Sequence, residues 1–484
     1  TNIFTQTKTS WLNTSQRFLK SFVMLLLLIG ANTALAQINY VRTTFTSAYT
    51  PITVGGGATQ INVGTGLGDF STTGGVASGT EGSAHILWPF NFTYNGVSFT
   101  TASDFLGIST NGYVYPVTAA VGGTNAGKLI SNVNTNLFTT TSPHATIAPY
   151  FDDLSIGTAI NGNTGTVLYQ VTGSAGSQVL TIQYTNVPAF SSGSVKALNF
   201  QVKFYETTNE IEFHYGPVIN GTVAGAYNTS ETASIGIESA TGGNTNYIDA
   251  ITGSKTANTS LITSNKFSQI RNTRFTPGTP VALAAGTYTV GVGQMYTSLS
   301  EAFADLNHRG IAGAVTLDLM DAVYDTTVAG GLNIFPLVTS NIAGTSVANT
   351  ITVSRTGLPA DLRYRGTDAG NLGNQASVSI IGTTFEPILA VIGTDFMSVN
   401  NVNFTYNGVQ GTGVSYQTTT GKVDCAIGLI NSSATDGATN NTFSNFVCTN
   451  DRTNPASTQA IRHFTQTTPT SAAGANSNNT YRDF

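Results

Sequence analysis

The sequence predicts an all-β protein in two parts: an antiparallel β-sandwich, followed by a parallel β-helix that a short helix caps at its N-terminal end. Short runs in which apolar and polar residues alternate recur at intervals of about 8–14 residues in the first part. One motif occurs twice near the C-terminus, and charged residues make up only 9% of the 484 residues. The chain begins with Thr1 instead of Met and ends within a patterned segment. We therefore expect a piece of a longer protein, whose β-helix is incomplete at its C-terminal end.

The composition excludes several classes of protein. Ordinary soluble domains contain roughly 25% charged residues, whereas this chain combines its low charge with 40% hydrophobic residues, among them 19 Tyr and 26 Phe. Such a chain can bury enough apolar surface to exclude disorder driven by charge. Lys and Arg together number 19 against 24 Asp and Glu, which argues against a nucleic-acid partner. The scarcity of Glu and Lys also excludes a charged coiled coil.

The N-terminus follows the pattern of a secretory signal peptide. A positively charged start precedes a short apolar core at 22–29, and an A-x-A cleavage site at Ala34 and Ala36 leaves Gln37 as the mature start. The apolar run is too short to cross about 30 Å of hydrocarbon comfortably, and no later run approaches that length. Residues 1–36 are therefore predicted to be a lead and a signal peptide. The mature chain is expected to have no transmembrane span and to be secreted, extracellular or attached to the outer cell surface.

Residues 38–276 are predicted to form the antiparallel β-sandwich. The clearest element is a β-hairpin, in which 200–205 and 211–215 alternate apolar and polar residues on both sides of a short polar turn. The alternation places His214 on the solvent face of this hairpin. Further strands are predicted over 167–171, 179–184 and 233–237. Many short strands with turn residues between them are typical of a sandwich.

Two motifs in this region resemble those of nidogen-like extracellular domains. Residues 107–113 read GISTNGY, similar to the STNG turn of that family, and residues 147–154 read IAPYFDDL, similar to its IAPFWAD motif. Strands follow in the family's order, so the resemblance covers residues 85–240. It is closer still to domains of large secreted proteins from Bacteroidetes-type bacteria. Tyr150-Phe151 departs from the Phe-Trp of animal members, which weakens the transfer of their partners to this chain. The resemblance implies a β-sandwich with a role in extracellular adhesion or display.

A Pro- and Gly-containing linker is predicted at 277–285, and the start of the β-helix at 286–484. One helix is expected, because Ser298 can cap it and Glu301 follows three residues later, as in a capping box. Gly310 is expected to end this helix. Its apolar face consists of Leu299, Ala302, Phe303 and Leu306. Strands are predicted over 315–320, 350–354, 378–381, 388–392 and 398–404.

The C-terminal part contains a repeat that favours a parallel β-helix. NNTFSNF at 440–446 recurs as NNTYRDF at 478–484, an offset of 38 residues, and VNNVNF at 399–404 is an earlier relative. Because one coil cannot bury its apolar face alone, equivalent positions stack, and Asn side chains at turns can hydrogen-bond along the axis. The expected helix would cover the open edge of the first coil. Residues 286–324 resemble the N-terminal cap of pectin-lyase-like right-handed β-helices. A second β-sandwich is the alternative.

The chain has two cysteines, Cys425 and Cys448. Their separation of 23 residues is about one coil of such a solenoid, so we expect them to stack at equivalent positions on neighbouring coils. An exported protein meets an oxidising compartment, which permits a disulfide between them. The alternative is that both are buried small hydrophobic residues.

One loop is a candidate metal site. Asp152 and Asp153 are adjacent, and Asn161 and Asn163 could add oxygen ligands for Ca²⁺. The alternative is a turn at a strand end, in which the carboxylates accept backbone N–H bonds. No other cofactor is predicted. The histidines are scattered, and a histidine metal site is not expected: His85, His144, His214, His308 and His463.

Catalytic chemistry has weak support in the sequence, since neither a nucleophile elbow nor a phosphate-binding loop occurs. β-helix enzymes cleave polysaccharides with carboxylates beside Arg or Lys, and hydrolysis needs two carboxyl groups about 5–9.5 Å apart. Carboxylates on adjacent coils would meet that distance, whereas solvated loop charges are the alternative. The candidates are Asp361, Arg363, Arg365, Asp368, Asp395, Asp424 and Asp436. Aromatic candidates for stacking on sugars are Tyr113, Tyr115, Tyr205 and Tyr215, although core packing is expected for most of them.

These observations predict a secreted or cell-surface adhesion and display protein that is not catalytic and that binds an extracellular glycan or a surface matrix. One alternative is a polysaccharide lyase or glycoside hydrolase of the β-helix class, with catalytic coils near or beyond the C-terminal end. A second alternative is a structural spacer within a large surface protein.

Overall fold

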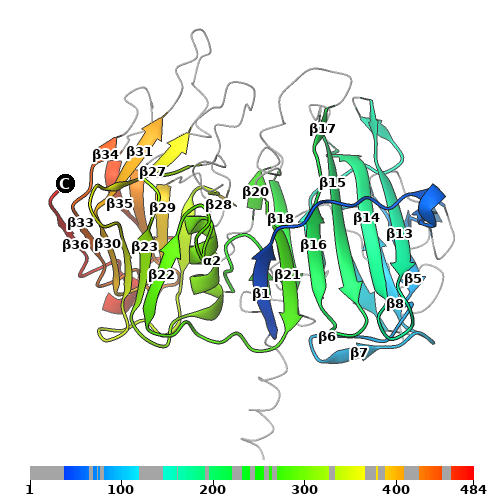
Figure 1. Cartoon of the computed structure of the whole chain (residues 1–484), viewed down its shortest axis with the longest axis horizontal. Helices are drawn as coiled ribbons and strands as arrows, with labels where there is room; N and C mark the ends of the chain where they lie inside the picture. Colours follow the sequence, from blue (N-terminus) through cyan, green and yellow to red (C-terminus); the bar gives the residue numbers. More distant parts are fainter. Residues whose placement is uncertain are drawn as a thin grey trace, which may run out of the picture.

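A computed structural model gives the fold of most of the chain from residue 38 onward (Figure 1). It describes residues 38–64, 69–72, 75–76, 81–118, 145–160, 162–190, 196–220, 232–239, 246–255, 261–263, 267, 270–325, 333–365, 378–379, 387–407, 425–449 and 459–484. The predicted lead and signal peptide, with Ala34, Ala36 and Gln37, lie outside these residues. The described chain is nearly all β, and its one α-helix is α2 (Leu299–Arg309). Two short 3-10 helices are η1 (Val54–Gly56) and η6 (Ala472–Gly474).

Two antiparallel sheets make up the first region, residues 38–277. Sheet A contains, in spatial order, β1 (Tyr40–Phe45), β21 (Asn272–Pro277), β16 (Ile211–Tyr215), β15 (Lys196–Tyr205), β14 (Val179–Pro188), β13 (Thr166–Thr172) and β2 (Thr59–Ile61), with β17 (Ile219–Asn220) beside β15. Sheet B contains β28 (Val378–Ser379), β20 (Leu261–Thr263), β18 (Thr232–Glu238), β10 (Ile147–Phe151), β9 (Val114–Val117), β8 (Phe105–Ser109), β5 (Ser83–Leu87), β3 (Ser71–Thr72) and β4 (Gly75–Val76), with β19 (Tyr247–Asp249) beside β18. Separate pairs are β6 (Phe92–Tyr94) with β7 (Val97–Phe99), and β11 (Ala159–Ile160) with β12 (Asn163–Thr164).

Sheets A and B share one hydrophobic core. Trp88, which follows β5, meets Phe204 of β15 in a T-shaped contact with ring centroids 5.3 Å apart. The Tyr184 hydroxyl of sheet A donates a hydrogen bond of 2.7 Å to the carbonyl of Ser109 in sheet B. Because burial of apolar surface drives folding, these contacts hold the two layers face to face. The antiparallel part of the predicted fold is confirmed.

The predicted hairpin forms as β15 and β16, which pair in register from Phe200↔Tyr215 to Phe204↔Ile211. The expectation that His214 faces solvent is wrong, because this residue is only 5% exposed. The polar face of the hairpin is covered by residues 46–57, which cross sheet A between β1 and β2 (Figure 1). The alternation therefore predicts the strands correctly but not what covers their outer face.

Glutamine side chains hold this crossing segment to sheet A. Ile52 N donates to Gln183 Oε1 at 2.8 Å, and Gln183 Nε2 donates to Ile52 O at 3.0 Å. On the neighbouring strand, Gln201 Nε2 donates to Thr50 O at 2.9 Å. A primary amide offers a donor and an acceptor, as a peptide group does. The two side chains thus supply hydrogen bonds to the backbone of the crossing segment, as a neighbouring strand would, although the segment is not part of the sheet.

Three parallel sheets make up the second region, residues 286–484. Parallel sheet 1 contains β22 (Gly286–Val290), β23 (Val315–Leu319), β26 (Ile351–Ser354), β30 (Met397–Asn400), β33 (Thr442–Ser444) and β36 (Thr480–Arg482). Parallel sheet 2 contains β24 (Val323–Tyr324), β27 (Ala360–Arg365), β31 (Val402–Asn407) and β34 (Cys448–Thr449). Parallel sheet 3 contains β25 (Leu337–Ser340), β29 (Pro387–Ile392), β32 (Cys425–Ile430) and β35 (Gln459–Phe464). From β23 onward the chain visits sheets 1, 2 and 3 in turn and then returns to sheet 1.

The repeat stacks in register. Phe443 of β33 pairs with Tyr481 of β36, and their rings stack with centroids 5.7 Å apart. Along the same sheet, Met397 N donates to Asn441 Oδ1 and Asn441 N donates to Asn479 Oδ1, each at 2.9 Å. The predicted hydrogen bonding between stacked Asn residues is therefore confirmed.

Asn441→Ala is expected to lower the free energy of unfolding by about 2 kcal/mol. Asn441 is fully buried and also donates to Thr394 O at 2.9 Å, so its loss leaves buried backbone groups unsatisfied. Urea unfolding of both proteins measures the change. Thr442→Ala, in the adjacent half-buried position, is the control and should cost clearly less. Equal losses for the two variants would contradict a role for the amide.

Two strands of the second region differ from the prediction. Residues 398–404 form two strands, because Asn401 turns the chain with a φ of 60° between β30 and β31. Asn tolerates this left-handed conformation better than most residues. The predicted strand at 378–381 is β28, which pairs antiparallel with β20 of sheet B and not with a parallel sheet. The second region thereby contributes an edge strand to the first.

Helix α2 begins and ends as predicted. Ser298 Oγ accepts from Glu301 N at 3.3 Å, and Gly310 follows the last turn with a φ of 71°. The helix lies beside β25, where Asn307 donates to Val338 O at 2.9 Å and accepts from Ser340 N at 2.8 Å. One side chain thus satisfies the edge of parallel sheet 3, and the expectation that the helix covers a sheet edge is confirmed.

The two cysteines lie on different sheets. Cys425 belongs to β32 of parallel sheet 3, and Cys448 belongs to β34 of parallel sheet 2. No disulfide joins them. The expectation that they occupy equivalent positions on neighbouring coils is wrong, because the loop lengths between strands vary and a separation in sequence does not fix the sheet.

Candidate functional site

The two family-like motifs lie against each other in sheet B. Asn111, in the turn after β8, accepts at its Oδ1 a hydrogen bond of 3.1 Å from Leu154 N, and Asp152 N donates to its carbonyl at 3.3 Å. Gly112 has a φ of 77°, and a Cβ there would lie 2.0 Å from Tyr150 O. Glycine is therefore required where the turn approaches the strand, which gives a physical reason for the STNG pattern.

Asp152 and Asp153 form a turn at the end of β10. Asp153 N donates to Asp152 Oδ1 at 2.9 Å, as the turn alternative expects. Burial raises the pKa of the Asp153 carboxyl. Asn163 is buried in β12, and Asn161 lies outside the described residues. The part of the chain that the structure describes contains no group of three or more His, Cys, Asp or Glu residues placed to hold a metal ion. Calcium binding at this turn stays a prediction.

The four tyrosines proposed for sugar stacking are mainly packed inside the protein. Tyr113 and Tyr115 are fully buried or nearly so, which contradicts a role for them as exposed platforms. The rings of Tyr205 and Tyr215 are half-buried. Their hydroxyls donate to Glu212 Oε2 at 2.5 Å and to Pro149 O at 2.8 Å. Core packing accounts for Tyr113, Tyr115 and Tyr215, whereas Tyr205 binds Glu212 on the outer face of sheet A.

Glu212 is the centre of a buried polar cluster on the outer face of sheet A. Its Oε2 accepts from the Tyr205 hydroxyl and lies 2.8 Å from His214 Nε2. Its Oε1 accepts from Arg274 Nε at 2.7 Å. Burial alone would raise the pKa of Glu212, but these hydrogen bonds outweigh burial and lower it to about 2. The sequence showed His214 but not this cluster, because its members come from three strands.

The carboxylates proposed for polysaccharide cleavage fall into two groups. Asp361 forms an ion pair with Arg363 of the same strand, with Oδ2 and Nη2 2.7 Å apart. Arg365 is the last residue of β27, whereas Asp368 and Asp424 lie outside the described residues. The structure brings the remaining two, Asp395 and Asp436, together on successive turns.

Asp395 and Asp436 are held by turn contacts. Asp395 Oδ1 accepts from Thr439 N at 2.6 Å and from Thr439 Oγ1 at 2.7 Å. Ser432 Oγ donates to Asp436 Oδ2. Burial raises the pKa of Asp395, and the nearby negative charge of Asp436 raises it further, against the hydrogen bonds from Thr439. A carboxyl group with a raised pKa can serve as the general acid of an acid–base site.

Helix α2 joins the two regions. Arg42 N of β1 donates to His308 Nε2 at 3.0 Å, and Asn307 Nδ2 donates to Thr252 O at 2.7 Å. Burial lowers the pKa of His308 to about 2, so its imidazole is neutral and acts as the acceptor. Gly253 has a φ of 69°, and a Cβ there would lie 1.9 Å from Ala304 O of the helix. The two backbones therefore touch.

The core of the first region continues across this junction. It includes apolar side chains from parallel sheet 3: Val338, Ala390, Ile392, Cys425 and Ile430. The two regions consequently share a hydrophobic core as well as hydrogen bonds, and they form one packed body in the described structure.

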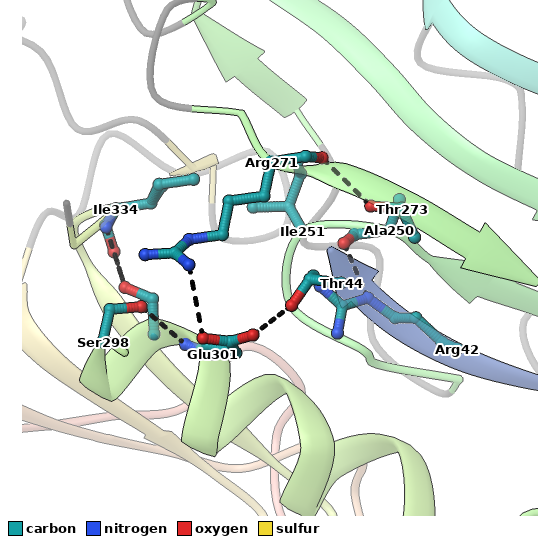
Figure 2. Close-up of a pocket in the computed structure, with 10 residues that line it drawn as sticks. Arg42, Thr44, Ala250, Ile251, Arg271, Thr273, Ser298, Glu301 and Ile334 are labelled. Atoms are coloured by element: carbon teal, nitrogen blue, oxygen red, sulfur yellow. Dashed lines mark hydrogen bonds and ion pairs between the residues drawn. The ribbon is translucent and has the colours of Figure 1, made fainter. Parts of the chain in front are cut away.

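A small polar cavity lies in the junction (Figure 2). Its volume is about 30 Å³, and its lining includes Arg42 of β1, Arg271 before β21, and Glu301 of α2. Arg271 Nη1 lies 3.5 Å from Glu301 Oε2, and Thr44 Oγ1 donates to Glu301 Oε1. The capping-box pattern identified Glu301 only as a helix residue. Its ionic partner is 30 residues away in sequence and belongs to the other region, so no local pattern could predict the pair.

The comparisons with known proteins agree with this arrangement over the first region. A family model described as NIDO related matches residues 39–283. No curated protein and no solved structure matches the chain. Among the helical residues that the structure describes, no segment has the length and apolar character needed to cross a bilayer.

Proposed function

Because this chain belongs to the NIDO-related family, we propose that it is a secreted or cell-surface adhesion and display protein, which binds a glycan or a matrix component without catalysing a reaction. The observation that carries this proposal is the packed junction between the family region and the parallel sheets. A rigid connection would hold a binding domain at a fixed angle to its support. Shared core residues and backbone contact at Gly253 provide such a fixed connection.

The support in this proposal is a right-handed parallel β-helix built by the second region. The cyclic order of the strands through three parallel sheets favours it, as do the stacked Asn side chains. Right-handed crossovers between parallel strands are strongly preferred, and the resemblance to pectin-lyase-like caps points to the same hand. The export of the protein rests on the signal-peptide pattern at residues 1–36.

Binding of the full chain to arrays of glycans and matrix proteins tests the adhesion proposal. We expect saturable binding to one class of glycan or matrix component, and no binding by the heat-unfolded chain. Release of reducing ends from pectin or alginate would contradict a non-catalytic role. Failure to bind any component would favour a structural spacer.

A second candidate function is polysaccharide cleavage, which is favoured by the proximity of Asp395 and Asp436. In this case the wild-type chain should release reducing ends, and Asp395→Asn and Asp436→Asn should each remove the activity. Asp361→Asn is the matched control, since Asp361 is paired with Arg363 on another sheet. Activity that survives both substitutions would exclude this pair as the acid and base.

A further inference from the structure

Arg42 carries a buried positive charge with few hydrogen bonds. The residue is 6% exposed, and its Nε donates to Ala250 O at 2.7 Å. Its two terminal nitrogens have no hydrogen-bond partner among the residues that the structure describes. Figure 2 shows this guanidinium beside Thr44, and Glu301 joins Thr44 on one side to Arg271 on the other. These nitrogens border the cavity, where water or a bound anion can accept from them.

The acidic groups nearby are already engaged. Glu301 accepts from Thr44, and from the backbone and hydroxyl of Thr297 at 3.2 and 3.0 Å. It also forms an ion pair of 3.5 Å with Arg271, whose Nη1 donates to Thr297 Oγ1. Asp249 accepts from Ile251 N at 2.7 Å and from Thr252 Oγ1 at 2.8 Å. Arg42 therefore lies within the field of these carboxylates but forms no direct ion pair with either. Burial lowers its pKa, so one more negative charge beside it would stabilise the charged form.

The cavity selects by size and by charge. A volume of about 30 Å³ exceeds the roughly 10–15 Å³ that one water needs but is far below the roughly 300 Å³ of small-molecule sites. Two arginines, several hydroxyl groups and the Glu301 carboxylate, which Arg271 and Thr44 engage, line the cavity. The N-terminal end of α2 adds its partial positive charge. A sugar or a nucleotide is too large for this space.

We propose that the junction cavity binds one compact inorganic anion of the halide class, held by the terminal nitrogens of Arg42. The anion would accept from the terminal nitrogens of Arg42, which no protein group satisfies. Since Arg42 belongs to the first region and α2 to the second, the bound ion would link the two regions. Halide binding would then stabilise the folded chain according to halide concentration.

Anomalous diffraction from crystals of the full chain grown in sodium bromide tests the site directly. The expected result is a bromide peak in the cavity, within hydrogen-bond distance of a terminal nitrogen of Arg42. Ordered water with no anomalous signal at this position would overturn the proposal.

Thermal unfolding tests the linkage in solution. At constant ionic strength, replacing gluconate by chloride should raise the Tm of the wild type by about 2–4 °C at saturation. Arg42→Gln should lose this difference. Arg363→Gln, which removes an arginine paired at the surface of parallel sheet 2, should keep it. Equal Tm values of the wild type in the two salts would contradict the proposal, even where Arg42→Gln fails to fold.

Discussion

Gly253→Ala is expected to lower the free energy of unfolding by about 3 kcal/mol. Two effects contribute. A residue with a Cβ is strained at a φ of 69° by about 1–2 kcal/mol. The new Cβ would also lie 1.9 Å from Ala304 O of α2, and relief of such an overlap typically costs about 1–3 kcal/mol. Because the overlap falls between two backbones, neither side can yield by a change of rotamer.

Urea unfolding of the variant and the wild type measures this loss, and Gly293→Ala is the matched control. Gly293 has a φ of 75° but no atom within 4 Å of the position of its Cβ. The control should therefore show only the backbone strain, about 1–2 kcal/mol. Limited proteolysis gives a second readout, since a loosened junction should expose residues 277–285 to cleavage. Equal destabilisation by both variants would show that contact with α2 does not matter.

Glu212→Gln is expected to lower the free energy of unfolding by about 2 kcal/mol, because buried donors lose their charged acceptor, while the Arg274 side chain, which is 42% exposed, stays solvated. The Glu212 side chain is 3% exposed and accepts from Tyr205, His214 and Arg274. A glutamine amide presents N–H groups to some of these donors and leaves Arg274 without its counter-charge. Glu210→Gln is the control, because Glu210 is half-buried and, among the described residues, its carboxylate accepts from two threonine hydroxyls, Thr276 Oγ1 and Thr208 Oγ1. Its cost should stay below about 1 kcal/mol.

The same residue predicts a dependence of stability on pH. The pKa of Glu212 falls to about 2 in the folded chain, below its ordinary value of 4.5. The folded state therefore binds a proton less readily than the unfolded state, and the carboxylate stabilises the fold above pH 4.5. This contribution is lost as the pH falls from 4.5 towards 2. The difference in unfolding free energy between the wild type and Glu212→Gln should shrink as the pH falls across this range. A difference that stays constant would contradict the lowered pKa of Glu212.

Local patterns predicted most of the elements but not their surroundings. The hairpin of β15 and β16, helix α2 and the stacked strands β33 and β36 follow from alternation, a capping box and a repeat. Burial of His214 could not be predicted, since it depends on residues 46–57, which cross the sheet from a distant part of the chain. The pairing of β28 with β20 escaped prediction for the same reason.

The candidate sites show the same division. The two motifs around Asn111 and Asp152 were visible in the sequence, and the structure adds that they touch. The cavity could not be predicted from the sequence, because Arg42, Arg271 and Glu301 share no local pattern and meet only when the two regions pack. Distances between carboxylates likewise depend on which turns stack, so Asp395 and Asp436 could be named but not paired.

The pairing of β1 with β21 constrains how this protein can fold as its chain emerges from the ribosome or the export channel. Residues 40–45 align with residues 272–277, so the first strand of sheet A has no neighbour on that side until the last strand has emerged. At a synthesis rate of about 5–20 residues per second, β21 follows β1 by more than about ten seconds. Helix α2, which binds Arg42 of β1 through His308, arrives later still. Closure of the first region and its attachment to the second are therefore both late events, which leave the N-terminal strand without its partners during most of synthesis.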